Sequence, residues 1–210
     1  VMASLEELCP IDGGDDRADV LIRSASELLE ESGLEGLTIR AVLLRSGFAR
    51  RAFYELFSSK DDLVLAVFEN TLTNAARQFR AQAADAHDPV DALRMIVTGI
   101  VVGQLGFGSA TSRRSAALSQ EHLRLAQTRP KDLQAALQPL LALICEIITE
   151  GMKRGQLRVS DPHFQATLVY NFVSATVHVE LLTEENGYAD LSRREQLSDY
   201  IWDFCHRALI

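Results

Sequence analysis

The chain has 210 residues, of which 47% are hydrophobic and 24% are charged, and its formal net charge is -8 at pH 7. This length suits one substantial core or a small domain joined to a larger one. The negative net charge excludes nucleic-acid binding through bulk charge, so that such a role needs a local basic patch. Cys9, Cys145 and Cys205 lie far apart without metal-ligand spacing, which argues against a disulfide framework and a metal site and favours a reducing cytoplasm.

The helical period recurs along almost the whole chain, and no segment of useful length alternates like a β-strand. The predicted fold is therefore all-α. Residues 1–16 are expected to form a flexible tail. The first helix is predicted from Arg17 to Ser32, with Gly33 as its C-terminal stop.

Two short helices are predicted next. Thr38 is expected to cap a helix over Ile39 to Ser46, which Gly47 ends, and a second helix over Ala49 to Phe57 follows after only a turn. At about 100° per residue, one side of the second helix is apolar. That side holds Ala49, Ala52, Phe53, Leu56 and Phe57, and the opposite side holds Arg50, Arg51, Tyr54 and Glu55.

The segment from Thr38 to Lys60 is basic within an acidic protein. Its positive residues are Arg40, Arg45, Arg50, Arg51 and Lys60, and its only acid is Glu55. Two short helices with a tight glycine turn and a basic outer face on the second are typical of a helix-turn-helix. Ser59 is expected to cap the following helix, whose Lys60 can reach a phosphate of DNA.

The alternative interpretation is an ordinary solvated surface, because a pair of adjacent arginines alone is usually inert. What favours DNA binding is the joint order of an amphipathic helix, a glycine break, a threonine-capped helix, a glycine turn, a basic and aromatic helix, and the run S-S-K-D-D-L.

The stretch LTIRAVLLRSGFARRAFYELFSSKDDLV resembles the DNA-binding signature of the tetracycline-repressor (TetR) family of bacterial transcription regulators, and the likeness extends over about Arg17 to Phe68. The resemblance implies DNA contacts from Thr38, Arg40, Ala49, Arg50, Arg51, Tyr54 and Lys60. The chain departs from the family pattern at Leu43, Ala49 and Leu56. These changes suggest altered packing of the two short helices, a weaker cap and a weaker phosphate contact, while the arginines remain.

The resemblance and the periodicity together predict a tail over 1–16, a helix-turn-helix DNA-binding domain over 17–62, and a helical effector-binding and dimerisation domain over 63–210, with about nine helices in all. The remaining helices are predicted over residues 61–86, 89–107, 113–127, 131–154, 162–182 and 192–209. The uncharged stretch from Met95 to Ser112 is interpreted as a buried helix that runs into a loop, since its glycines and polar residues do not suit a membrane span.

The helix over 162–182 is apolar around most of its circumference, which indicates either a central position or a surface shared with a partner. One stripe holds Phe164, Leu168, Phe172, Ala175 and Val179. In proteins of the TetR family the last two helices pack against those of a second subunit, so a homodimer is expected through 162–182 and 192–209. The predicted interface residues are Val169, Val173, Val177, Leu181, Leu197 and Ile201.

The resemblance also implies an effector cavity among the middle helices. Its predicted lining is Phe79, Met95, Val102, Phe107, His122, Leu141, Ile144, Phe172 and Thr176. Gly99, Gly103, Gly106 and Gly108 suggest the position of the cavity, although they equally suit close helix packing. His122 and His178 are isolated, and no nucleophile-base pair, phosphate loop or paired-carboxylate motif occurs, so neither a cofactor nor an enzyme is expected.

The predicted function is a cytoplasmic DNA-binding transcription regulator without a membrane anchor. It is expected to be a repressor that binds an inverted repeat in double-stranded operator DNA and leaves it when an unknown small, largely apolar effector binds. The alternative is an α-helical small-molecule-binding or catalytic domain whose basic face is incidental.

Overall fold

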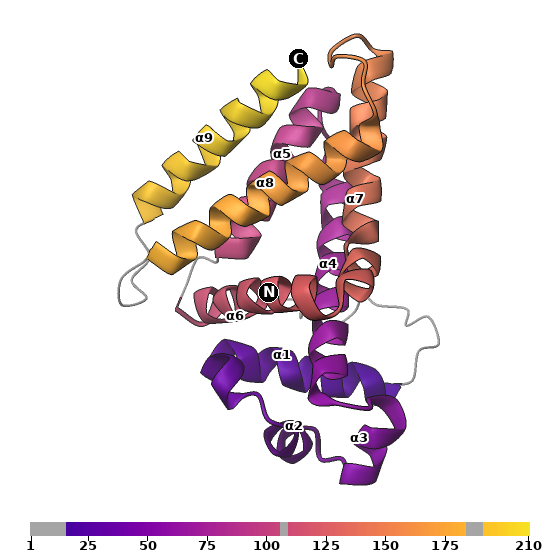
Figure 1. Ribbon diagram of the computed structural model, residues 1–210, viewed down its shortest axis with the longest axis vertical. Helices are drawn as coiled ribbons and strands as arrows, with labels where there is room; N and C mark the ends of the chain where they lie inside the picture. The colour runs from indigo at the N-terminus through magenta and orange to yellow at the C-terminus, as the bar shows by residue number, and fades with distance from the viewer. Residues whose placement is uncertain (1–15, 106–108, 184–190) are drawn as a thin grey trace, which may run out of the picture.

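Figure 1 shows the structure, a computed structural model that describes residues 16–105, 109–183 and 191–210. Within these ranges the chain forms nine helices and no strand, which confirms the predicted all-α fold. The helices are α1 (Asp16–Gly36), α2 (Ile39–Ser46), α3 (Arg50–Leu56), α4 (Lys60–Ala84), α5 (Pro89–Leu105), α6 (Ser109–Thr128), α7 (Pro130–Lys153), α8 (Pro162–Thr183) and α9 (Leu191–Leu209). The predicted tail lies outside the described residues, except for Asp16, which begins α1.

Local capping sets several helix ends where the sequence predicts them. The Thr38 hydroxyl accepts a hydrogen bond from the Ala41 amide at 3.1 Å, and Ser59 accepts one from Asp62 at 3.2 Å. Gly47 ends α2 with a φ of 74°, in the left-handed region that favours glycine. The carboxylates of Asp88 and Asp161 cap α5 and α8 in the same way, ahead of a proline at the first helical position.

Two helix boundaries differ from the predictions by more than two residues. The first helix extends to Gly36, but Gly33 within it has a φ of 63° and breaks the helical geometry where the stop was expected. Helix α6 begins at Ser109, ahead of the predicted residue 113. Helix α7 continues through Pro139, a position exposed to solvent. These ends depend on packing as well as on local sequence.

A small apolar core joins the first helices to the start of α4. The members of this N-terminal core are Leu21, Ala25, Leu28, Leu29, Leu37, Val42, Phe53, Phe57, Leu63, Val64, Val67 and Ala117. Because Leu63, Val64 and Val67 belong to α4, the predicted domain boundary at residue 62 falls inside this helix. Ala117 belongs to α6, so the N-terminal core also touches the larger domain.

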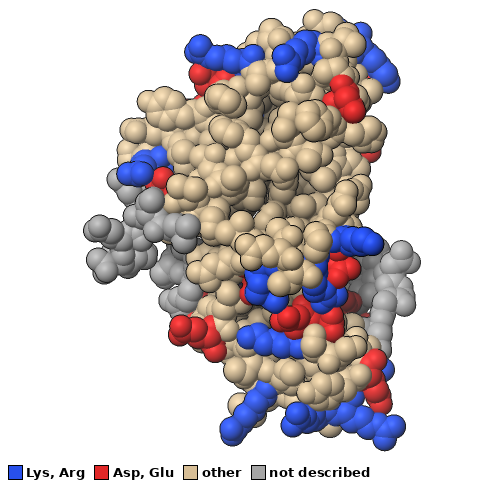
Figure 2. Space-filling view, in the orientation of Figure 1, with Lys and Arg blue, Asp and Glu red and all other residues tan. Residues whose placement is uncertain are grey.

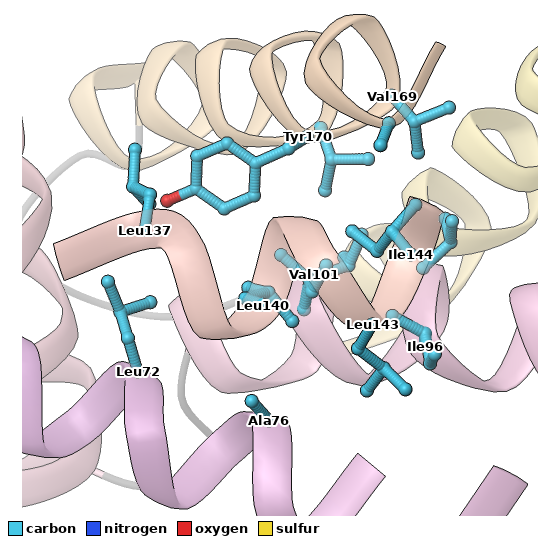
Figure 3. Packing of buried hydrophobic residues seen from close by; sticks show 14 of the residues in the cluster. Leu72, Ala76, Ile96, Val101, Leu137, Leu140, Leu143, Ile144, Val169 and Tyr170 are labelled. Carbon is cyan, nitrogen blue, oxygen red and sulfur yellow. The ribbon is translucent and has the colours of Figure 1, made fainter. Parts of the chain in front are cut away.

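The larger core fills the bundle of α4, α5, α7 and α8. Figure 3 shows α7 between α8 and α4, with Leu140 and Ile144 of α7 turned toward their neighbours and Tyr170 reaching down from α8. Leu140 is 2% exposed and Ile144 is fully buried. In the described part of the chain α7 alone is long and apolar enough to cross a membrane, and it packs here against α4, α5 and α8.

Four of the six residues predicted for the dimer interface lie inside the core of their own chain. Val169, Val173 and Val177 of α8 are at most 5% exposed, and Ile201 of α9 is 2% exposed. Leu181 and Leu197 are partly buried against the same core. The three valines and Ile201 therefore fill the bundle of their own chain and are not available to a second subunit. Since α8 is apolar on nearly every side, its sequence does not indicate which side faces inward.

Candidate DNA-binding interface and effector cavity

Helix α3 is anchored by aromatic side chains on its inner face. The Phe53 side chain is fully buried in the N-terminal core, and its ring centroid lies 5.7 Å from that of Phe57. The short turn after Gly47 leads directly to Ala49, which precedes the helix without a side-chain cap. With the inner face fixed in this way, the opposite face of α3 is held outward as a rigid surface.

The outer face of α3 presents arginine and tyrosine side chains to solvent. The Arg51 side chain is 91% exposed, and Tyr54 is 46% exposed. The Arg50 guanidinium lies 5.5 Å from the centre of the Tyr54 ring, a cation-π contact that holds both side chains in one orientation. Figure 2 shows Lys and Arg side chains gathered at the end of the molecule that α2 and α3 form.

The other residues predicted to contact DNA lie around this face. Thr38, Arg40 and Ala49 are exposed on or beside α2 and α3, and Lys60 is half-buried at the first position of α4. The structure thus brings all seven predicted positions to one end of the molecule, while their contact with DNA stays a prediction. Leu43, which departs from the family pattern, is partly buried against the N-terminal core.

Internal ion pairs lower the free positive charge of this surface. The Arg45 guanidinium donates to Glu31 at 2.8 Å, and its hydrogen bonds lower the pKa of that carboxyl. Arg51 pairs with Glu55 at 3.1 Å. Arg45 is thus a structural link from α2 to α1. Of the five cations between Thr38 and Lys60, Arg40, Arg50 and Lys60 have no ion pair with another residue that the structure describes.

Three arginines in α6 and immediately after it connect the larger domain to the DNA-binding domain. The pairs are Arg114 with Glu30, Arg124 with Asp61 and Arg129 with Asp62, at N–O distances of 2.9, 2.9 and 2.6 Å. Two of the carboxylates lie in the first turn of α4, next to Lys60. Hydrogen bonds from Arg129 and Ser59 lower the pKa of Asp62. Sequence reasoning missed these links because the partners are 63 to 84 residues apart.

A cavity of about 130 Å³ lies between α4, α5, α6, α7 and α8. Its described lining is Phe68, Thr71, Leu72, Ala75, Phe79, Gly99, Ile100, Gly103, Gln104, Ser115, Leu118, Ser119, His122, Leu140, Tyr170 and Ser174. Gly99 and Gly103 lie in its wall, in agreement with the interpretation of the glycine-rich stretch. A Cβ atom at Gly103 would meet nothing within 4 Å. Gly106 and Gly108 lie outside the described residues.

The predicted lining overlaps with this cavity only at Phe79 and His122. Met95, Val102 and Ile144 do not line it, and Leu141 lines a different hollow beside α6, α7 and α8. Phe172 and Thr176 line a groove between α8 and α9, and Phe107 lies outside the described residues. Periodicity identifies apolar positions on each helix, but the five helices meet at angles that only the tertiary structure sets.

The polar groups of the cavity gather at α6 and α8. The Tyr170 hydroxyl lies 3.5 Å from Nδ1 of His122, and the two rings stack with centroids 6.0 Å apart. Burial lowers the pKa of His122, with a smaller contribution from His178, so its imidazole is neutral near pH 7. Burial also raises the pKa of Tyr170. In the described residues no group of three or more His, Cys, Asp or Glu side chains is placed to hold a metal ion.

A second apolar surface lies on the outer side of α8 and α9. Its members are Phe164, Leu168, Val179, Tyr200 and Phe204, with exposed fractions of 61%, 48%, 58%, 74% and 58%. Phe172 stacks on Phe204 with ring centroids 4.5 Å apart, which joins the two helices at the surface. Figure 2 shows a wide area almost without charged side chains across the middle of this face, between charged side chains at its top edge and those at its lower end. The α8 members of this outer apolar face, Phe164, Leu168 and Val179, belong to the predicted stripe and were not among the predicted interface residues.

The comparisons with known proteins agree with this arrangement. Residues 21–67 match the model of the bacterial regulatory proteins of the tetR family. The chain is 26% identical over 179 residues to the HTH-type transcriptional regulator EthR of Mycolicibacterium smegmatis, which covers 84% of this chain and 80% of that one. It is 34% identical over 62 residues to the regulator YvdT of Bacillus subtilis, and this match spans only 32% of YvdT.

Solved structures of other regulators share the fold at low sequence identity. RolR in complex with resorcinol has a TM-score of 0.70 at 15% identity, over 92% of this chain and 87% of that one. FadR of Bacillus subtilis in complex with stearoyl-CoA has a TM-score of 0.71 at 16% identity, over 89% of this chain and 96% of that one. The likeness extends over both the DNA-binding end and the larger helical domain.

Proposed function

Because the chain belongs to the TetR family of bacterial regulatory proteins, we propose that it is a transcriptional repressor that binds operator DNA through α3 and leaves it when a small molecule occupies the cavity. The observation that carries this proposal is the outward arginine and tyrosine face of α3, anchored by the buried Phe53 and preceded by the capped helix α2. A cytoplasmic location follows from this role, since the operator is there.

Within the DNA complex, α3 enters the major groove, which is wide enough for one helix. Arg50 and Arg51 then reach base edges or phosphates, and the stacking of Arg50 on Tyr54 limits the conformations that binding must fix. Lys60, together with the backbone N–H groups at the start of α4, contacts the DNA backbone. Thr38, Arg40 and Ala49 flank these contacts from α2 and the turn.

The repressor acts as a two-fold dimer, because one helix-turn-helix neutralises few phosphates, and its operator is accordingly an inverted repeat. The outer apolar face of α8 and α9 forms the interface in place of the buried valines named above. Large apolar side chains that stay half exposed on two neighbouring helices are typical of a protein–protein contact.

Effector binding is coupled to DNA binding through α4 and α6. Helix α6 lines the cavity with His122 and also carries Arg124, which binds Asp61 next to Lys60. A displacement of α6 therefore moves the start of α4 and changes the separation of the two DNA-binding domains of the dimer. Resorcinol and stearoyl-CoA in the related structures support small-molecule control. The expected coupling is about 1–3 kcal/mol, and it is reciprocal.

The deciding experiment is a gel-shift titration of the purified chain against DNA flanking its own gene. Binding to a discrete site at nanomolar to micromolar protein, lost in Arg50→Ala, supports the repressor. The cavity alone would also suit the alternative, a helical domain that binds or converts a small molecule and has an incidental basic face. Equal and weak binding of all DNA fragments, unchanged in Arg50→Ala, would favour that alternative.

A further inference from the structure

The described wall of the cavity combines apolar and polar side chains. Its large apolar members are Phe68, Leu72, Phe79, Ile100 and Leu140. Its polar members are Thr71, Gln104, Ser115, Ser119, His122, Tyr170 and Ser174, and the contacts of Tyr170 with His122 and with Ser174 define the polar end of the cavity. None of the described residues that line the cavity carries a formal charge near pH 7, although 24% of the chain is charged. The wall therefore selects for a neutral ligand.

The volume of the cavity limits the size of that ligand. At about 130 Å³ it is close to the roughly 150 Å³ apolar cavity that holds one benzene molecule. An acyl chain or a nucleotide does not fit into this space. The rings of Phe68 and His122 meet edge to face at a centroid distance of 5.8 Å, so the wall already contains the aromatic contacts that a further ring prefers.

Most hydroxyl groups of the wall are already bound within the protein. Thr71 donates to the Val67 carbonyl at 2.8 Å, Ser115 donates to the Gly103 carbonyl at 3.1 Å, and Ser119 lies 2.7 Å from Nδ1 of His178. The contact between Tyr170 and His122 is much longer, at 3.5 Å, which is the limit for a hydrogen bond. Tyr170 is also hydrogen-bonded with Ser174. Because a phenol oxygen has one donor and two acceptor sites, Tyr170 and the neutral imidazole of His122 both retain hydrogen-bonding capacity for a ligand.

The polar end adjoins a second hollow of about 190 Å³ between α6 and α8. Ser119, His122 and Ser174 belong to both spaces. The second hollow is also lined by Asn171 and Ala175, which are exposed on α8. A ligand that enters from this side places its apolar part in the cavity first and leaves its polar group beside His122 and Tyr170.

Charged ligands are disfavoured by the same wall. A carboxylate needs a positive partner or several donors when it leaves water, and an ammonium group needs an acidic partner. Neither partner occurs among the described lining residues. A hydroxyl group suits the site better, because it donates one hydrogen bond and accepts others, which matches a neutral imidazole and a phenol.

We propose that the cavity binds a neutral, single-ring aromatic compound with a hydroxyl group, its ring against Phe68 and Phe79 and its hydroxyl between His122 and Tyr170. This proposal names the ligand class of the proposed effector cavity and the two side chains that recognise the hydroxyl. The role of that ligand in regulation rests on the proposed function, whereas its binding to the cavity does not.

Calorimetric titration of the full chain with phenol, toluene and benzoate tests the assignment. Phenol is expected to bind about 3- to 10-fold more tightly than toluene, which lacks the hydroxyl, and benzoate is expected not to bind. In Tyr170→Phe the affinity for phenol falls to that for toluene, while the affinity for toluene is unchanged. Toluene thus serves as the internal control for damage to the cavity.

A second variant keeps the test decisive if Tyr170→Phe does not fold. Gly103 lines the cavity and is exposed, and a Cβ there would meet nothing within 4 Å, so Gly103→Leu is expected to fold and to weaken the binding of phenol and toluene alike. Binding of benzoate as tight as that of phenol, no binding of any probe, or full phenol affinity in Gly103→Leu would each overturn the assignment. Gel shift without any probe tests DNA binding separately, so a failure there leaves the ligand class unaffected.

Discussion

Replacing Phe204 by alanine should break the dimer without unfolding the chain. Phe204 is 58% exposed on the outer apolar face and stacks on Phe172, so about half of its side chain is available to a second subunit. Full burial of a phenylalanine contributes roughly 1.5–3 kcal/mol, so the exposed half contributes about 1–1.5 kcal/mol per copy. Because a two-fold interface contains the residue twice, the expected loss is about 2–3 kcal/mol, or roughly a 30- to 150-fold rise in the dimer Kd.

Sedimentation equilibrium over a dilution series measures this Kd directly. Val159→Ala is the matched control, since Val159 is 90% exposed but lies outside α8 and α9, and it should leave the Kd unchanged. Val173→Asp should behave differently from both, because it places a carboxylate at a fully buried position and lowers the melting temperature of each subunit. An unchanged Kd in Phe204→Ala, with a dimeric parent, would refute the assignment of the interface.

Three further predictions follow from the described contacts. Arg50→Ala should cost about 1–3 kcal/mol of operator binding if the lost contact is bidentate to guanine. Lys60→Ala should weaken binding to DNA of every sequence alike and reduce the slope of log K against log salt concentration by about one. Equal behaviour of the two variants in salt titrations would contradict the assignment. Gly47→Ala should lower the free energy of unfolding by about 1 kcal/mol, because Gly47 has a φ of 74°. Gly103→Ala should raise it by about 0.5–1 kcal/mol, because Gly103 lies within a helix and a Cβ there would meet nothing within 4 Å. Urea unfolding measures both changes, and effects of the same sign would exclude backbone conformation as their cause. Burial lowers the pKa of His122 in the folded state. The stability that its neutral form contributes is therefore present above about pH 6.5 and is lost as the pH falls through the folded-state pKa. Between pH 7.5 and 5.5 the melting temperature should fall further in the parent than in His122→Phe, and equal falls would show that His122 does not titrate in this way.

The coupling between the two domains rests on contacts that are individually weak. Arg124 and Arg129 pair with Asp61 and Asp62 through side chains that remain 29% to 50% exposed, so each pair contributes little to stability. Their importance is geometric, because both carboxylates lie in the first turn of α4, next to Lys60. An element that holds the DNA-backbone contact and also meets α6 transmits small displacements in either direction.

The sequence by itself determined the features that depend on short stretches of chain. Thr38, Gly47 and Ser59 act on backbone groups within three or four residues, so the ends of α2 were predictable to the residue and the start of α4 to within one residue. The apolar and basic sides of α3 were also predictable, because Phe53 and Arg50 differ sharply in their cost of burial. Helix-turn-helix recognition needs only this local order.

Tertiary structure decided the features in which several chemically similar choices compete. Val173 and Val179 lie on the same helix and are equally apolar, yet one is fully buried and the other is 58% exposed, because the packing of α5 and α7 selects one side of α8. The cavity depends in the same way on where five helices leave space, and so Tyr170 and Ser119 escaped prediction. Local propensity acts along the chain, whereas burial and long-range ion pairs such as Arg129 with Asp62 depend on contacts between segments that the sequence separates.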